Sequence, residues 1–182
     1  ISLLRLNLLL MLSLSQWSIA MSDRYYGDEA VNQAAKYYGY NGPLDPMAVH
    51  IIREEGFVPA VYKDSKGIDT EGVGLTEEFM GKNFFTEVMP VFEQRASSTT
   101  KGWPTLPDEA KSAIVSMAYR GDWGPNTKKA LSEGKWETAA KQYLDHDEYR
   151  KGKRKGATDA QRAISQRMER NAANIKALAD ES

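Results

Sequence analysis

The chain has 182 residues, a formal net charge of -1 and no cysteine. A chain of this length without an internal repeat predicts one domain with its own buried core, preceded by a short segment. The near-zero charge points to no particular partner. The absence of cysteine excludes disulfides, thiolate metal sites and a cysteine nucleophile.

Residues 1–20 are rich in leucine and carry one charge, Arg5. The run Leu6–Leu14 has the length of a signal-peptide core, and Ser18-Ile19-Ala20 offers small residues for cleavage. Its apolar stretch is short for a transmembrane helix. Three interpretations stay open: an export signal, sequence upstream of a start at Met21, and a retained membrane anchor.

Residues 21–45 are predicted to be a lead-in segment, and residues 46–182 the main domain. The lead-in is rich in tyrosine, with a short helix expected from Asp28 to about Tyr38, before the break at Asn41-Gly42-Pro43. Its tyrosines are expected to pack on the domain surface, with contact to a ligand as the alternative.

In the main domain, Asp45-Pro46 predicts the start of a helix that ends at Glu55, since Gly56 is a stop signal. Residues 57–76 alternate in polarity around a polar turn and predict a small antiparallel sheet. Helical spacing then returns, with Pro90 expected to kink a helix or mark its first turn. Further helices are predicted at 108–119, around 136–143, and from 158 to about 179. The predicted fold class is α+β, a small lobe with a short sheet joined to a larger helical lobe.

Glu55 is the first candidate catalytic residue. It ends an apolar stripe formed by Ala48, Ile51 and Ile52 and lies in the last turn of its helix. Partial burial and the helix dipole both favour the protonated carboxyl, which is the form a general acid needs. A surface glutamate at a helix end is the alternative. Glu54, its neighbour, is the competitor for the same role.

Asp64 and Thr70 complete the candidate set. Asp64 opens the polar turn Asp64-Ser65-Lys66-Gly67, where solvent and the neighbouring Lys63 and Lys66 are expected to keep it ionised. A protonated Glu beside an ionised Asp is the pairing that glycosidases use. If the turn closes a hairpin, the Thr70 hydroxyl is expected to face back toward Asp64. Taken alone, Asp64 is an ordinary turn residue and Thr70 a good strand former.

The segment from Glu55 to Gly74 resembles the catalytic segment of phage-type lysozymes, glycoside hydrolase family 24. That family shows Glu-Gly, an eight-residue gap to Asp, then Gly, Thr and Gly-x-Gly, and this chain has all of them in that order. The likeness continues more weakly over about residues 45–175. It implies a lysozyme-like fold and a muramidase, or endolysin, that cleaves between N-acetylmuramic acid and N-acetylglucosamine, usually with inversion. It further implies Glu55 as general acid, Asp64 positioning or activating water, Thr70 assisting, and no metal or cofactor.

Two positions depart from the family pattern. Leu75 stands where a histidine commonly follows Gly-x-Gly. Near the end of the central helix, where the family tends to place Asn or Gln along the cleft, the chain has Tyr119-Arg120. Tyr119 and Arg120 are therefore the candidate substrate-binding residues, and this wall of the cleft is where the chain differs from the family.

Two other signals are weaker. The run from Arg150 to Lys155 is strongly basic and suits either an anionic surface or, as the favoured interpretation, a solvated loop before the last helix. It lacks the aromatic residues typical of nucleic-acid binding. Asp145-His146-Asp147 has the composition of a metal site but not its spacing, so no metal is expected.

The expected function is peptidoglycan hydrolysis for phage-driven host lysis or wall penetration, by a monomer whose partner is bacterial peptidoglycan. Nucleic acid is not an expected partner, and a membrane is one only if residues 1–20 are retained. The expected location is the periplasm, or release at lysis, with cytoplasmic accumulation if translation starts at Met21. The alternatives are a lytic transglycosylase and a catalytically inactive wall-binding or virion structural module.

Overall fold

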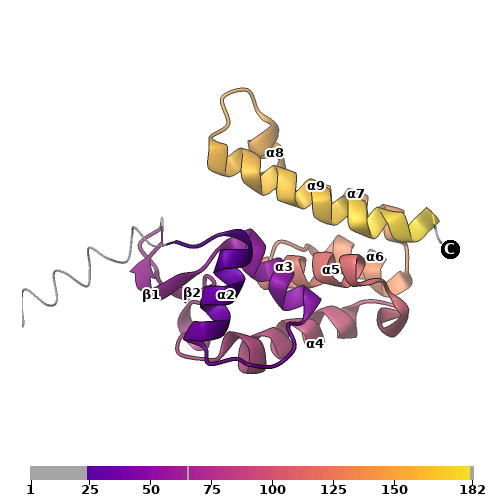
Figure 1. Ribbon diagram of the computed structural model, residues 1–182. Coiled ribbons are helices and arrows are strands. Elements are labelled where there is room, and N and C mark those ends of the chain that lie inside the picture. The colour runs from indigo at the N-terminus through magenta and orange to yellow at the C-terminus, as the bar shows by residue number, and fades with distance from the viewer. Residues whose placement is uncertain (1–23, 65, 181–182) are drawn as a thin grey trace, which may run out of the picture. The chain divides into compact units, whose positions relative to one another are not determined.

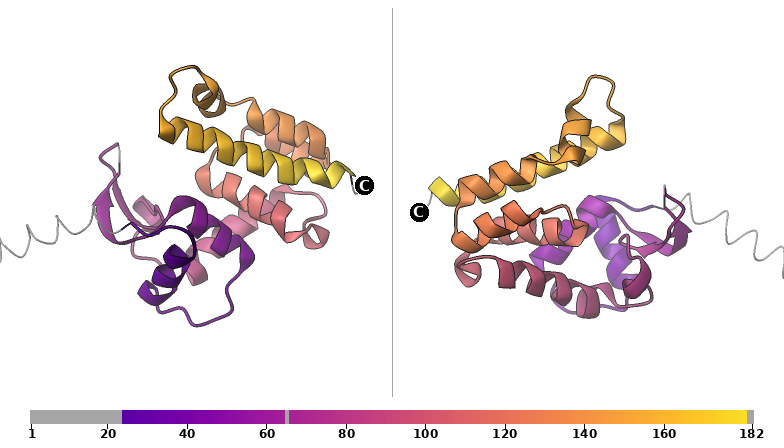
Figure 2. Two further views of the ribbon diagram at one scale, coloured as in Figure 1. Left: turned by 45° about the horizontal axis from the view of Figure 1, so that its top comes forward. Right: turned by 180° about the vertical axis from the view of Figure 1, so that it is seen from behind.

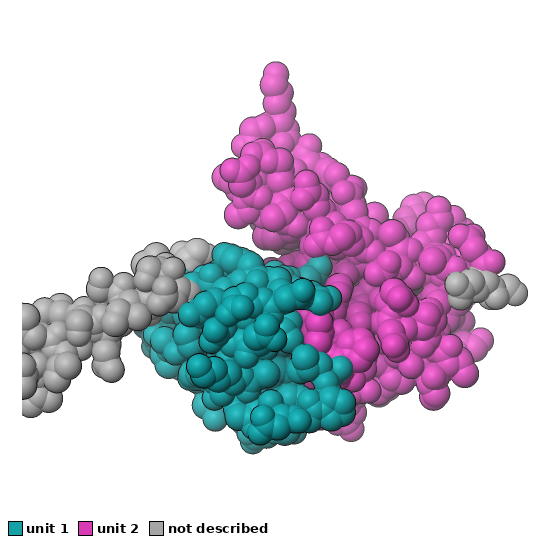
Figure 3. All heavy atoms as spheres, viewed as in Figure 1, with its two compact units in different colours: residues 1–44, 51–88 teal, residues 45–50, 89–182 magenta. Residues whose placement is uncertain are grey.

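The computed structural model describes residues 24–64 and 66–180. The chain divides into two compact units, which Figures 1 and 3 colour by sequence and by unit. Unit 1 contains residues up to 44 and residues 51–88, and unit 2 contains residues 45–50 and 89–182. The predictions made for residues 1–20 lie outside the described residues. Over 24–64 and 66–180, no helix combines the length and the apolar character that crossing a membrane requires.

Helix α3 (Pro46–Glu55) has the predicted bounds. Asp45 Oδ1 accepts hydrogen bonds from the amides of Met47 (2.7 Å) and Ala48 (3.2 Å), so Asp45 is the predicted N-cap. At the other end, Gly56 takes a left-handed φ of 72° and donates its N–H to the carbonyl oxygen of Ile52 at 2.9 Å. Both ends of the helix are therefore set by residues next to it in sequence.

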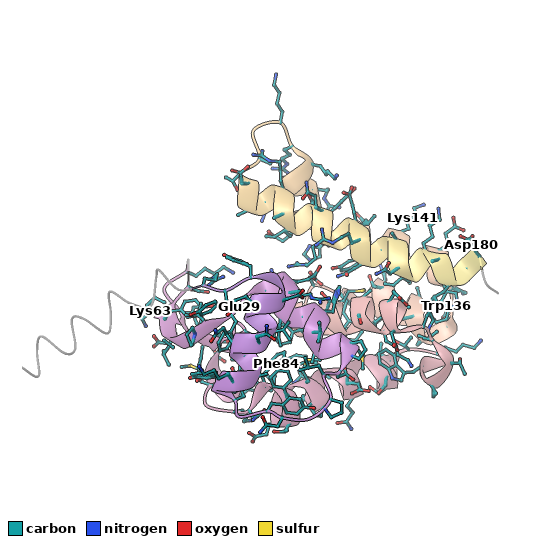
Figure 4. The ribbon with its side chains drawn as sticks, in the orientation of Figure 1. Glu29, Lys63, Phe84, Trp136, Lys141 and Asp180 are labelled. Atoms are coloured by element: carbon teal, nitrogen blue, oxygen red, sulfur yellow. The ribbon has the colours of Figure 1, made fainter. Side chains whose placement is uncertain are left out.

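The sheet of unit 1 is a two-stranded antiparallel hairpin, as predicted. Strand β1 (Val58–Lys63) pairs with β2 (Asp69–Gly72), and a bulge lies between Val58 and Val61. At the turn, Lys63 lies opposite Asp69, and the two side chains form an ion pair of 2.7 Å. Figure 4 labels Lys63 at this exposed end of the hairpin. The register fixes which side chains share a face, because facing residues on paired strands point the same way.

The lead-in segment packs into unit 1. Helix α2 (Gly27–Tyr37) matches the predicted helix, and Tyr25 forms a two-bond backbone bridge with Phe57, with N···O distances of 2.9 and 3.0 Å. After the sheet come the 3₁₀ turn η1 (Glu77–Phe79) and the π-helical turn η2 (Phe84–Val88). The unit contains an aromatic cluster in which Phe57 and Phe84 are fully buried. Its ring centroids lie 4.4 to 6.4 Å apart, and its members are Tyr37, Tyr38, Tyr40, Phe57, Phe84 and Phe85.

The rest of unit 2 is helical in its described part. Its helices are α4 (Met89–Thr99), η3 (Trp103–Thr105), α5 (Asp108–Arg120), α6 (Pro125–Glu133), α7 (Trp136–Leu144), α8 (Asp147–Lys153) and α9 (Asp159–Asp180). Every residue of α5 from Ser112 to Ala118 is buried, so α5 is the central helix of this unit. Helix α9 packs along α5, α7 and α8 (Figure 2). Pro90 lies in the first turn of α4, which is one of its two predicted places.

The expectation of a loop over Arg150–Lys155 is wrong for most of that run. Residues up to Lys153 belong to α8, because the His146 ring nitrogen Nδ1 accepts a hydrogen bond from the Glu148 amide and caps the helix. The pairs Arg150–Asp147 and Lys151–Glu148 then connect side chains three residues apart. Only Arg154 and Lys155 of the basic run fall in the connection between α8 and α9.

Candidate functional site

Glu55 lies where the sequence predicted, at the last residue of α3. Ala48, Ile51 and Ile52 are all buried, and Glu55 continues their stripe as a half-buried residue. Two features of position 56 explain why the residue after Glu55 is a glycine. Besides the left-handed φ, a Cβ at this position would lie 2.9 Å from the Tyr25 carbonyl oxygen. The Glu-Gly pair therefore ends the helix and lets the backbone of the lead-in segment pass close to Gly56.

Asp64 is held by its own turn. Its Oδ1 accepts the amides of Lys66 and Ile68, each at 2.8 Å, and its backbone N–H donates to the Ile68 carbonyl oxygen at 2.9 Å. These bonds, the Ile68 amide first, lower the pKa of Asp64 below its ordinary value of 3.8. The predicted ionised state is confirmed in direction, but its main cause is the turn amides. The charge of Lys66 contributes less, and Lys63 pairs with Asp69.

Thr70 is buried, with 4% of its surface exposed, and its hydroxyl donates to the Ile68 carbonyl oxygen at 3.1 Å. That oxygen is the same one that accepts the Asp64 N–H, so Thr70 and Asp64 are connected through one carbonyl group. The residue directly opposite Thr70 across the sheet is Tyr62, not Asp64. The hydroxyl therefore bonds to the Ile68 carbonyl oxygen, and a direct role beside Asp64 stays a prediction.

Tyr62 is related to each of the three predicted catalytic residues, Glu55, Asp64 and Thr70. It faces Thr70 across the sheet, and the negative charges of both Glu55 and Asp64 act on its hydroxyl. Burial is the first cause that raises the pKa of Tyr62 above 10, and the two carboxylates add to it. Sequence reasoning did not select Tyr62. The signal was available, because a strand places the side chain two residues before Asp64 on the face that Thr70 also uses.

Arg24 is a second residue that sequence reasoning missed. Its guanidinium carbon lies 5.2 Å from the centre of the Tyr62 ring, and its positive charge lowers the pKa of the Tyr62 hydroxyl, against the larger effect of burial. No local pattern points to this contact. It depends on the bridge between Tyr25 and Phe57, which pairs positions far apart in sequence. The candidate site of unit 1 therefore consists of Arg24, Glu55, Tyr62, Asp64 and Thr70.

Tyr119 and Arg120 belong to unit 2, at the end of α5. The Tyr119 ring packs edge-on against Phe92, with centroids 4.9 Å apart. Arg120 is exposed, and its charge acts on Asp122, whose pKa is raised by burial in spite of that charge and of its ion pair with Arg167. The substrate-binding role of Tyr119 and Arg120 stays a prediction.

The three residues with metal-site composition have structural uses within unit 2. His146 caps α8, and Asp145 and Asp147 both pair with Arg150. In the part of the chain that the structure describes, no group of three or more histidine, aspartate or glutamate side chains is arranged to hold a metal ion.

Comparison of this chain with models of protein families, with curated proteins and with solved structures finds no match.

Proposed function

We propose that this chain is a muramidase with a lysozyme-like fold, which hydrolyses the glycosidic bond between N-acetylmuramic acid and N-acetylglucosamine in peptidoglycan. The observation that carries the proposal is the gathering of Glu55, Asp64 and Thr70 around Tyr62. One carboxylate comes from the end of a helix, and the other from a turn that keeps it ionised. Two carboxyl groups in different surroundings are what acid and base roles at one bond require.

In the proposed reaction, the protonated carboxyl of Glu55 gives its proton to the glycosidic oxygen as the bond from that oxygen to the anomeric carbon breaks. A water molecule attacks the anomeric carbon, and the Asp64 carboxylate takes the proton that the water loses. The two hydrogen bonds from Lys66 and Ile68 both end on Asp64 Oδ1, so Oδ2 is the better placed oxygen to accept it. The proton then returns from Asp64 to Glu55 through solvent.

Thr70 has a limited choice of roles in this scheme. A hydroxyl group has one proton to donate, and Thr70 donates it to the Ile68 carbonyl oxygen. Toward a water molecule or a sugar hydroxyl it therefore acts as an acceptor. An acceptor beside Asp64 helps to orient a water proton, which agrees with an assisting role.

One observation favours a second candidate, a module that binds the wall without cutting it. Asp64 and Thr70 both take part in hydrogen bonds that hold their own hairpin, so each has a structural use without catalysis. Clearing of a suspension of purified peptidoglycan separates the candidates, since a binding module sediments with peptidoglycan but does not clear it.

The decisive experiment compares the wild type with Glu55→Gln and with Glu54→Gln as matched control. Both variants remove one carboxylate from the last turn of α3, and Gln keeps the size of the side chain. We expect the wild type to clear peptidoglycan, Glu55→Gln to lose at least about a hundredfold in rate, as loss of a general acid does, and Glu54→Gln to stay close to the wild type. A wild type that does not clear, or equal rates for wild type and Glu55→Gln, contradicts the proposal.

The products distinguish hydrolysis from transglycosylation. Hydrolysis leaves reducing ends, whereas a lytic transglycosylase leaves 1,6-anhydromuramic ends and needs no water-directing aspartate. Anhydro ends in the digest would therefore replace the proposed reaction with the second enzymatic alternative.

A further inference from the structure

Unit 2 carries a concentrated positive charge where α8 ends and its connection to α9 begins. Residues 149–158 contain five cations and no acidic residue. Three of these cations follow one another at residues 153–155, and all three are exposed. Residues 153–156 are called the basic tip below, because the connection projects from the end of the α8–α9 pair (Figure 1).

The basic tip is held in place by the packing of α8 on α9. Gly152 is buried, and a Cβ at its position would lie 2.3 Å from the Gln161 carbonyl oxygen, so only glycine allows this close approach of the two helices. A second contact is made by Glu169, whose Oε1 accepts the Tyr149 hydroxyl at 3.0 Å and pairs with the Lys153 ammonium at 2.6 Å. The cations that follow α8 are therefore presented from a fixed base.

The acidic residues of this part of the chain are already paired. Each of those between residues 145 and 169 binds a cation of the same segment: Asp145 and Asp147 bind Arg150, Glu148 binds Lys151, Asp159 binds Arg162, and Glu169 binds Lys153. In contrast, the side chains of Arg154 and Lys155 form no ion pair or hydrogen bond with another described residue. Two positive charges of the basic tip therefore face solvent and are open to an external anion.

The surroundings of the basic tip indicate the chemistry of its partner. Stable attachment to a membrane takes an apolar anchor beside a basic patch, and single-stranded nucleic acid is bound by stacking on exposed aromatic rings. Among the described residues, the exposed large apolar side chains all belong to unit 1. The basic tip thus offers charge without an apolar or aromatic surface, which suits a hydrated polyanion. Peptidoglycan is such a polymer, because its peptides carry free carboxylates.

We propose that Arg154 and Lys155 form a wall-binding surface, which binds the carboxylates of the peptides attached to the glycan strands. The inference rests on the proposed muramidase function, because it takes peptidoglycan as the partner, but it assigns the basic tip no part in bond cleavage. The attraction of two exposed charges is weak at a single contact. A polymer repeats its carboxylates, so a released basic tip finds the next one at high effective concentration, and the enzyme stays on the wall.

The first test measures sedimentation with purified peptidoglycan, in the Glu55→Gln background to prevent digestion. The tip variant, Arg154→Gln/Lys155→Gln, is compared with Lys141→Gln/Lys176→Gln, which removes the same charge from exposed lysines of α7 and α9 (Figure 4 labels Lys141). We expect the dissociation constant to rise about three- to tenfold in the tip variant and to stay close to the parent value in the control. The difference should vanish at about 1 M salt, where the screening length falls to about 3 Å. Equal binding of the two variants at low salt overturns the inference.

The second test identifies the anion. Coupling the peptide carboxyl groups of peptidoglycan to an uncharged amine with a carbodiimide removes their charge and leaves the glycan intact. We expect the parent protein to bind this amidated material as weakly as the tip variant binds untreated peptidoglycan. Unchanged binding of the parent to amidated peptidoglycan overturns the inference. So does a tip variant that loses binding to phosphatidylglycerol vesicles but keeps its binding to the wall, since the partner is then a membrane.

Kinetics separate this inference from the muramidase proposal. In the chain that keeps Glu55, the tip variant should raise KM on intact wall about three- to tenfold and leave kcat unchanged. Its kcat/KM on short soluble glycans without peptides should equal that of the wild type, and a loss there overturns the inference. Circular dichroism checks that all variants are folded. A wild type that does not clear peptidoglycan instead contradicts the muramidase proposal, and the sedimentation test still decides on the basic tip.

Discussion

Thr70 faces Tyr62 across the two-stranded sheet, and its hydroxyl shares the Ile68 carbonyl oxygen with the backbone N–H of Asp64. One carbonyl group at the hairpin turn thereby fixes two of the three predicted catalytic residues. The third, Glu55, comes from the end of α3, and its charge raises the pKa of Tyr62, the residue that faces Thr70.

Replacing Thr70 tests whether its hydroxyl does more than hold the turn. Thr70→Val keeps the shape of the side chain and removes the hydroxyl, and Thr70→Ser keeps the hydroxyl. We expect Thr70→Val to lose about 1 kcal/mol of stability, the value of one hydrogen bond, and to clear peptidoglycan at least about tenfold more slowly. Thr70→Ser should retain most activity. Equal clearing rates for Thr70→Val and Thr70→Ser would reduce Thr70 to a structural residue.

Asp64→Asn separates the structural from the chemical use of Asp64. The asparagine oxygen can still accept the amides of Lys66 and Ile68, so we expect the hairpin to form, as measured by circular dichroism and thermal melting. The neutral amide cannot take a proton from water, so peptidoglycan clearing should fall by at least about a hundredfold. Asp64→Ala, which loses the turn bonds as well, is the comparison and should melt at a lower temperature than Asp64→Asn.

The lowered pKa of Asp64 also predicts that the protein loses stability at acidic pH. The folded-state pKa of Asp64 is lowered below 3.8, so its contribution is present above pH 3.8 and is lost as the pH falls through the folded-state value. In Asp64→Asn this part of the acid dependence should be absent. Urea unfolding of both proteins at pH values on either side of 3.8 measures it. An identical acid dependence of the two proteins would contradict the role of the turn amides.

The sequence predicted those elements whose ends are set by neighbouring residues. Helix α3 has its cap at Asp45 and its stop at Gly56, and the hairpin turn is closed by Asp64 itself. The buried stripe of α9 follows from helical spacing, since Met168, Ile175 and Leu178 recur on one side, whereas burial in α5 extends to every residue from Ser112 to Ala118. In each of these cases the signal lies within one turn or one helix, which is the range over which sequence patterns act.

What the sequence did not predict depends on long-range contacts or on side-chain pairing. Arg24 reaches Tyr62 because Tyr25 pairs with Phe57, and no pattern in the lead-in segment indicates that bridge. The basic run was expected to be a solvated loop before the last helix, but acidic residues one turn earlier pair with Arg150 and Lys151 and stabilise α8.

Tyr37 should make unit 1 sensitive to alkaline pH. Its hydroxyl donates to Oε1 of the buried Glu71 at 2.7 Å, while the Gly81 amide binds Oε2. Burial, and then Glu71, raise the pKa of Tyr37 from 10.0 to about 12. A raised folded-state pKa gives stability that is complete below pH 10 and is lost as the pH rises toward 12.

Tyr37→Phe removes that contribution. Tyr37 is 43% exposed, so solvent screening limits the expected loss at neutral pH to about 1 kcal/mol. Urea unfolding at neutral pH and between pH 10 and 12 should show the difference from the wild type shrinking as the pH rises. Tyr26→Phe, at a tyrosine with 64% exposure, is the control and should change stability little. A difference that stays constant with pH would contradict the assignment.

The close approach of Gly72 and Tyr38 predicts that substitutions at these two residues have non-additive effects on the free energy of unfolding. Gly72 has a φ of 61°, and a Cβ there would lie 2.1 Å from the Tyr38 hydroxyl oxygen. That hydroxyl is buried and has no hydrogen-bond partner among the described residues. Gly72→Ala should therefore destabilise the protein, by about 1–2 kcal/mol for the left-handed backbone and more for the contact with Tyr38.

Removing the Tyr38 hydroxyl should relieve the cost of the contact with the new methyl group, but not the cost of the left-handed backbone at residue 72. Tyr38→Phe alone should leave stability unchanged or raise it, because the buried hydroxyl makes no hydrogen bond that the variant would lose. In the double variant, the loss from Gly72→Ala should shrink to the backbone cost, since the phenyl ring no longer presents the oxygen atom that the new methyl group would meet. Urea unfolding of the four proteins gives the coupling free energy. Independent effects of the two substitutions would show that the Tyr38 ring moves aside, and would contradict the close approach of its hydroxyl to Gly72.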